Sequence, residues 1–248
     1  MITGVPLAEG ATLTRRDRAA QAGPSTVVVR HPDGSLGRHG AVVTFPVAAP
    51  EEGRSVRVGA ASGRALAHEI TWPVGGSYAR VRGDLPRPEL VAVAAATDVV
   101  SGRPHIDPPT GLSVKATGTS RAPFVNEARY HSKDTGEADA LSGGLTFAGV
   151  ARCGGLEDQL YAGRVETAGT VDGRSAVVTS AFGGNGALAW EAAPGVVAYV
   201  GYSGAQLDEG AIAALHRLAA RTRLLSPEQW QATSPATGDQ SNDFSRPG

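Results

Sequence analysis

Residues 53–58 read GRSVRV and residues 173–178 read GRSAVV, so four of six positions are identical 120 residues apart. A tryptophan follows each stretch, at Trp72 and Trp190, and after it come a glycine-bearing turn, an apolar strand and a helical segment. The same order of elements occurs twice, which indicates an internal repeat, and a repeat constrains the whole fold more strongly than any local pattern. We therefore predict a tandem duplication.

The local patterns agree with this order of elements. Apolar and polar residues alternate from Leu66 to Trp72, as in a strand with one buried face. Asp208 is placed to cap a helix with an apolar stripe in the second copy. Pro86 and Pro88 open the corresponding helix in the first copy, where missing amides cost little. Each copy is thus expected to end in a helix that packs on its sheet.

Hairpins account for the other apolar stretches. Residues 25–31 and 41–47 flank a turn with proline and Asp-Gly. Residues 145–150 and 159–165 flank a pair of glycines and are predicted to form another hairpin. The fold class is therefore α+β, a tandem duplication of two antiparallel-sheet units, each with a C-terminal helix packed on its sheet.

The expected division of the chain follows from its composition. The first unit is predicted at residues 1–105 and the second at residues 106–233, with a linker at residues 101–111, which are too rich in glycine and proline to continue a helix. Residues 234–248 are polar and are expected to be a disordered tail. A groove between the two units would be the default place for a ligand.

Composition excludes several classes of partner. The 23 basic residues nearly balance the 24 acidic ones, so no nucleic acid is expected as a partner. The single cysteine, Cys153, cannot form an intrachain disulfide, and the sequence leaves its reactivity open. The longest apolar run, Leu90 to Ala96, is far shorter than the roughly 20 residues of a membrane helix. The chain is therefore not expected to insert into a membrane.

The first residues contain neither a basic segment nor an apolar segment of the kind found in a secretory signal. Two localisations follow. The protein is cytoplasmic, or it is an extracytoplasmic piece of a longer chain from which an anchor has been removed.

One serine lies where a strand bends directly into a helix. Ser203, in Gly201-Tyr202-Ser203-Gly204-Ala205, has the position of a nucleophile in an elbow, but the motif needs glycine where Ala205 stands. The neighbouring strands are predicted to be hairpins, whereas a hydrolase of that kind needs a parallel sheet. Ser203 therefore remains only the starting point for a hydrolase as an alternative.

A second candidate lies in residues 126–139. Glu127 and His131 are four residues apart and would share a face if they were helical, so they could ligate a metal. Arg129 and Lys133 lie among them, which favours a solvated charged loop. We accordingly assign no catalytic, cofactor-binding or metal-binding residue and no cofactor, and we interpret Trp72 and Trp190 as core residues.

The C-terminal part carries a resemblance. Residues 189–196, the segment Leu207-Asp208-Glu209 and residues 225–230 form a tryptophan hairpin followed by a helix. The pattern covers residues 174–232, with a weaker echo at 54–100. It resembles the extracytoplasmic α+β domain of actinobacterial single-pass membrane proteins of uncharacterised function. The resemblance implies an outward-facing sensory or interaction module and brings no catalytic residues.

The expected function is a non-enzymatic binding, sensing or protein-interaction module, whose partner is an unknown protein or small ligand. One alternative is a hydrolase or metal-dependent enzyme that uses Ser203 or the Glu127/His131 loop. Another is a structural or assembly subunit.

Overall fold

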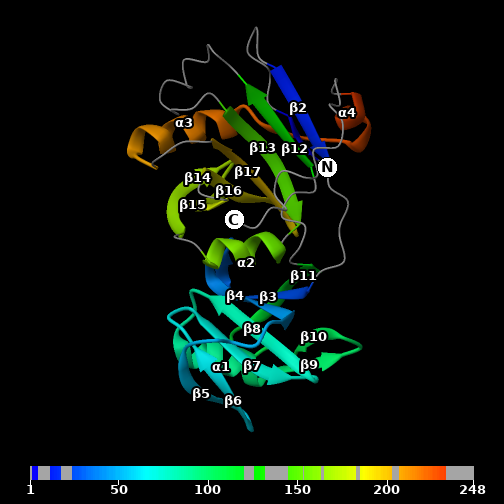
Figure 1. Cartoon of the computed structure of the whole chain (residues 1–248). Helices are drawn as coiled ribbons and strands as arrows, with labels where there is room; N and C mark the ends of the chain where they lie inside the picture. Colours follow the sequence, from blue (N-terminus) through cyan, green and yellow to red (C-terminus); the bar gives the residue numbers. More distant parts are fainter. Residues whose placement is uncertain are drawn as a thin grey trace. The chain divides into compact units, whose positions relative to one another are not determined.

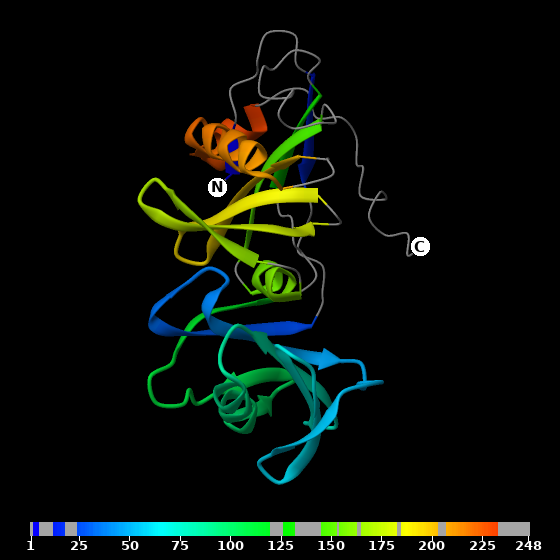
Figure 2. The same cartoon turned by 90° about the vertical axis from the view of Figure 1, so that its left-hand side faces the viewer.

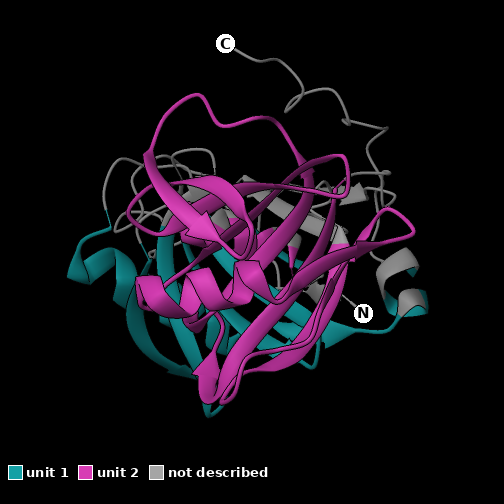
Figure 3. Cartoon of the chain, turned by 90° about the horizontal axis from the view of Figure 1, so that it is seen from below, with its two compact units in different colours: residues 1–20, 124–152, 164–248 teal, residues 21–123, 153–163 magenta. Residues whose placement is uncertain are grey.

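The computed structural model describes residues 2–4, 12–17, 24–119, 126–131, 145–152, 154–162, 165–182, 185–202 and 207–232 (Figure 1). Antiparallel sheet with few helices makes up this part of the chain, which confirms the α+β class. Two compact units are present (Figure 3). Unit 1 comprises residues 1–20, 124–152 and 164–248, and unit 2 comprises residues 21–123 and 153–163.

Unit 2 is built on a seven-stranded antiparallel sheet with the order β11-β3-β4-β8-β7-β6-β5. Its strands are β3 (Ser25–Ser35), β4 (Arg38–Val47), β5 (Arg54–Val58), β6 (Ala61–Ala65), β7 (Glu69–Val74), β8 (Ser77–Gly83) and β11 (Ser113–Thr119). Helix α1 (Arg87–Ala95) follows β8 and precedes a ribbon of β9 (Thr97–Val100) and β10 (Arg103–Ile106).

The apolar face of the unit 2 sheet packs against α1. Ile70 and Trp72 on β7 are buried together with Leu90 and Val93 of the helix, and Trp72 is only 2% exposed, so the prediction of a core tryptophan is confirmed. Pro86, at the N-cap position, and Pro88 lie at the start of α1 as predicted. The strand begins later than the alternation suggested, because the amide of Leu66 donates to the carbonyl of Glu69 in a turn.

Unit 1 is built on a second seven-stranded antiparallel sheet, with the order β14-β15-β16-β17-β13-β12-β2. Its strands are β2 (Thr12–Asp17), β12 (Asn126–His131), β13 (Leu145–Arg152), β14 (Val165–Val171), β15 (Arg174–Phe182), β16 (Asn185–Ala193) and β17 (Val196–Tyr202). Helix α3 (Glu209–Ala220) lies along one face (Figure 2), and β18 (Arg223–Leu225), paired with β1 (Ile2–Gly4), and α4 (Pro227–Ala232) follow it.

The core of unit 1 lies between its sheet and helix α3 and contains the second tryptophan. Trp190 is 3% exposed and is buried with Val200, Leu215 and Leu218, so the second tryptophan is a core residue as predicted. Asp208 caps α3, since its carboxylate accepts a hydrogen bond from the amide of Ala211 at 2.7 Å.

The two sheets run through their strands in the same succession. From the strand next to one edge to the opposite edge, unit 2 has β3-β4-β8-β7-β6-β5 and unit 1 has β12-β13-β17-β16-β15-β14, and a helix follows β8 and β17. The strand beside β3 is β11, whereas the strand beside β12 is β2, from the start of the chain. N-terminal residues therefore take in unit 1 the edge position that β11 takes in unit 2.

This pairing divides the chain differently from the expected units at residues 1–105 and 106–233. Residues 113–119 belong to the unit 2 sheet because β11 pairs along β3, and residues 2–17 contribute strands to unit 1. The stretch predicted as a linker, residues 101–111, contains β10. The tail at residues 234–248 lies outside the described residues.

Two local predictions need correction. The predicted hairpin of residues 145–150 and 159–165 is wrong, because helix α2 (Gly155–Ala162) stands between two strands of unit 1 and packs in unit 2. Gly154, at φ +97°, turns the chain directly into that helix and does not form the hairpin turn that was predicted there. The GRS match also joins unlike strands, since Arg54 begins the edge strand β5 and Arg174 begins β15, the second strand.

The cap of α3 is open to a direct test. Asp208→Ala is expected to lower the free energy of unfolding by about 0.5–2 kcal/mol, because the amide of Ala211 loses its acceptor. Asp208→Asn keeps an acceptor oxygen and is expected to lose much less. Urea denaturation followed by tryptophan fluorescence measures both, and equal losses in the two variants would contradict the capping role.

Candidate functional site

The second face of the unit 2 sheet is unusually polar for the middle of a sheet. Side chains alternate along a strand, so Arg80 and Arg82, which alternate with the buried Ala79 and Val81 of β8, turn away from α1. We call this the polar face. Its members on the sheet are Thr26, Arg30, Thr44, Arg64, Glu69, Thr71, Arg80 and Arg82. Cross-strand pairing sets Arg80 directly between Thr71 and Thr44.

Helix α2 brings carboxylates to this face. Glu157 is fully buried and accepts from both Nε and Nη2 of Arg30, at 3.1 and 2.7 Å. The backbone amide of Gly37 donates to Oε1 of Glu157 at 3.3 Å, and the hydroxyl of Tyr161 donates to the same atom at 3.4 Å. Burial, with the charge of Glu157 beside it, raises the pKa of Tyr161 well above its usual value. The bidentate geometry holds α2 on β3 by charge-assisted hydrogen bonds.

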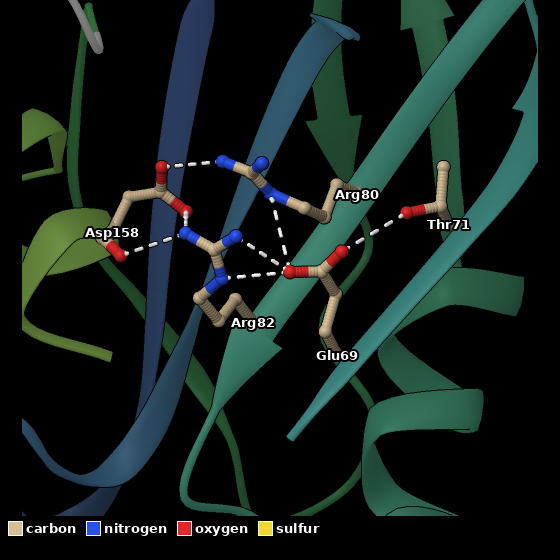
Figure 4. A network of polar contacts seen from close by, with 5 residues as sticks. All are labelled: Glu69, Thr71, Arg80, Arg82 and Asp158. Carbon is tan, nitrogen blue, oxygen red and sulfur yellow. Dashed lines mark hydrogen bonds and ion pairs between the residues drawn. The ribbon is translucent and has the colours of Figure 1, made fainter. Parts of the chain in front are cut away.

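The neighbouring residue of α2 joins the helix to β8 (Figure 4). Oδ2 of Asp158 accepts from Nη2 of Arg80 at 2.6 Å. Nη1 of Arg82 donates to the backbone carbonyl of Asp158 at 3.3 Å and lies 3.6 Å from its Oδ1. Burial raises the pKa of Asp158, and the positive charges of Arg80 and Arg82 oppose that rise.

Glu69 of β7 completes the network. Its Oε2 accepts from both Nε and Nη2 of Arg82, at 2.8 and 2.6 Å, and the hydroxyl of Thr71 donates to Oε1 at 3.5 Å. Nε of Arg80 lies 3.9 Å from Oε2 of Glu69, too far for a hydrogen bond. Arg82 is thus neutralised by Glu69, whereas Arg80 has only one close carboxylate contact, with Asp158.

Buried polar atoms without a hydrogen-bond partner gather in this place. In the described part of the chain there are four: Thr26 Oγ1, Thr44 Oγ1, Arg80 Nε and Asp158 Oδ1. All four belong to the polar face or to the helix that covers it. Groups of this kind are usually satisfied in native proteins, and leaving one unsatisfied is costly. Their concentration around Arg80 singles out this region as a candidate binding site.

A cavity of about 540 Å³ adjoins the network and includes Arg80 in its wall. We call it the unit 2 cavity. It is lined by Val47, Ala48, Ala49, Pro50, Glu51, Glu52, Arg64, Leu66, Glu69, Thr71 and Arg80. Leu66 is 43% exposed, which gives the cavity an apolar surface beside its charges. The size falls in the range of small-molecule sites.

A separate polar contact joins β3 to α1. Nε2 of His31 lies 2.7 Å from Oε2 of Glu89, and Nδ1 lies 3.0 Å from the carbonyl of Gly111. Both partners are acceptors, so the imidazolium, which has two N–H groups, suits the position best. The hydrogen bond to Glu89 is the largest of the contributions that raise the pKa of His31 above 6.5.

The residues named from the sequence have other locations. Ser203 and Cys153 lie outside the described residues. Glu127 and His131 lie on strand β12, where residues four apart are separated by about 13 Å, so the helical arrangement that would bring them together is not formed. Among the described residues no group of three His, Cys, Asp or Glu side chains could hold a metal ion.

Sequence reasoning missed the arginines and carboxylates of the polar face. A signal for three of them was present, because Arg80 and Arg82 alternate with the apolar residues of β8 and Glu69 alternates with those of β7. Charged residues at such spacing in a central strand indicate a sheet face that meets charged partners. The partners on α2 had no comparable signal.

Comparison with known proteins adds no relative. No protein-family model, no curated protein and no solved structure matches this chain. Within the described residues no helix is both long enough and apolar enough to span a membrane.

Breaking the buried pair of Arg30 and Glu157 is expected to destabilise unit 2 strongly. Glu157→Gln should lower the free energy of unfolding by about 3–5 kcal/mol, because the buried guanidinium of Arg30 then faces a neutral amide. The double variant Arg30→Met, Glu157→Leu should lose less than the single variant, since no charge stays buried there. Urea denaturation measures both, with the exposed Glu209→Gln as control. A double variant that loses as much as the sum of its single variants would contradict the coupling.

The contact of His31 predicts a pH dependence. Since its pKa is raised in the folded protein, its contribution to stability is complete below pH 6.5 and is lost as the pH rises through the folded pKa. The melting temperature of the wild type should therefore fall from this cause as the pH is raised above 6.5, and that component should vanish in His31→Asn. His68→Asn, at an exposed histidine, should keep it. Equal pH slopes in the wild type and His31→Asn would contradict the assignment.

Proposed function

We propose that the protein is a non-enzymatic binding or sensing module and that its ligand lies in the unit 2 cavity. The observation that carries the proposal is the position of Arg80, which borders the cavity and also contacts α2. Of its three guanidinium nitrogens, only Nη2 donates a hydrogen bond within the described part of the chain. The Nε atom is buried, so Nη1 is the donor that this guanidinium has to spare, and such a donor beside a cavity is suited to an acidic group of a ligand.

A comparison of the two units supports a functional origin of these charges. Trp72 pairs across its hairpin with Ala79, and Trp190 pairs in the same way with Ala198. With these pairs aligned, the unit 1 positions that match Glu69, Thr71, Arg80 and Arg82 are Ala187, Ala189, Tyr199 and Gly201. A sheet of the same strand succession is therefore built without these charges, so the succession of strands alone does not require them, and in unit 2 they also hold α2.

We further propose that the units arose by tandem duplication. The shared strand succession, the helix after β8 and β17, and the two tryptophan-alanine pairs support this proposal. On this proposal β1 and β2 pair with β18 and β12 in the second copy, as β10 and β11 pair with β9 and β3 in the first. The outward-facing position of the module in an actinobacterial membrane protein is also a proposal, supported by the resemblance of residues 174–232.

Side-chain NMR offers the test of binding at Arg80. We expect the Nε–Hε resonance of Arg80 in the labelled full chain to shift on titration with L-leucine or with isovalerate, two carboxylates of similar shape. The Nε–Hε resonance of Arg82 is the internal control, because that group already donates to Glu69 and should move less.

A matched pair of variants completes the experiment. Arg80→Gln should abolish the binding of both compounds, whereas Arg103→Gln, at an exposed arginine of β10 outside the lining, should leave it unchanged. If neither compound moves the Arg80 resonance, or if both bind Arg80→Gln as tightly as the wild type, the proposed function is wrong.

A further inference from the structure

We propose that the unit 2 cavity takes a small zwitterion of the amino-acid class, with its carboxylate on Arg80 and its ammonium group at Glu51 and Glu52. The inference rests on the proposed function and specifies the ligand of the same cavity. It follows from the arrangement of charge and apolar surface in the lining.

The carboxylate end is assigned by the donors. Asp158 holds Nη2 of Arg80 and the Nε atom is buried, so Nη1, which has no hydrogen bond in the described part of the chain, is the donor left for a ligand. Arg64, also in the lining, is exposed and donates through Nη1 to the carbonyl of Gly53 at 3.3 Å, which leaves further N–H groups. A carboxylate thus meets two guanidinium groups, of which Arg80 is the better held.

The ammonium end is assigned by the carboxylates. Glu69 is already paired with Arg82, but Glu51 and Glu52 are exposed neighbours in the segment between β4 and β5. A simple anion would meet Arg80 but would also face these two charges, and a simple cation would face the arginines. Since like charges at a binding site weaken association, a molecule with both charges fits the lining best.

The apolar part of the ligand follows from the remaining lining. Residues 47–50 are Val-Ala-Ala-Pro, and Leu66 exposes 43% of its surface. An aliphatic side chain buried against these residues would gain hydrophobic free energy. L-Leucine therefore serves as the probe, and a cavity of about 540 Å³ has ample room for it.

Three compounds of the same carbon skeleton test the class of ligand. L-Leucine carries both charges, isovalerate lacks the ammonium group, and isoamylamine lacks the carboxylate. Titration calorimetry on the full chain should give leucine a dissociation constant at least about tenfold lower than either of the others, as expected when one charge-assisted contact is lost. The Arg80 resonance should follow the same order of affinity.

Surface variants keep the test independent of folding. Glu51→Gln with Glu52→Gln changes only exposed residues and should weaken leucine binding by about tenfold or more, to the level of isovalerate, without weakening isovalerate binding. Asp98→Asn with Asp107→Asn makes the same change of charge at exposed residues outside the lining and should change neither affinity.

The outcomes separate this inference from the proposed function. If isovalerate binds as tightly as leucine at Arg80, the zwitterion is wrong and the binding function stands. Equal affinity of isoamylamine and leucine, or unaltered leucine affinity in the Glu51 and Glu52 variant, also overturns the inference. If none of the three compounds binds, both the inference and the proposed function fail.

Discussion

The pairing of buried charges between helix α2 and the polar face is the constraint on which unit 2 depends. Removing an arginine from water is costly unless a carboxylate meets it in good geometry. Arg30 and Arg80 meet Glu157 and Asp158 of the helix, at 2.7 and 2.6 Å. Without α2 both guanidinium groups would lose these carboxylates, so the segment that joins two strands of unit 1 is an integral part of unit 2.

The two faces of the unit 2 sheet have different tasks. The face that packs on α1 is apolar and resembles in composition the core of unit 1, where α3 covers the sheet. The polar face holds a helix by charge and leaves Arg80 at the edge of a cavity. Unit 1 has the same strand succession with Tyr199 and Gly201 at the matching positions, so the strand succession alone does not require these charges, which in unit 2 hold α2.

Local features of the fold were predictable, and distant partners were not. Helices α1 and α3, the cap at Asp208 and the buried tryptophans each follow from a few adjacent residues. The contacts of the site join residues 78 and 127 positions apart, which no local pattern reveals. For the same reason the pairing of N-terminal strands in unit 1 was not predicted, and the two GRS stretches lie on strands at different positions in their sheets. The alternation of charged and apolar residues in β8 is visible in the sequence, but the partners of these charges are not.

The most direct test of the central claim is a crystal structure of the full chain grown with L-leucine. We expect electron density for the amino acid in the unit 2 cavity, with its carboxylate within hydrogen-bond distance of Arg80, while Arg80 keeps its contact with Asp158. Leucine bound elsewhere on the chain with this cavity unchanged, or a carboxylate turned away from Arg80, would contradict it.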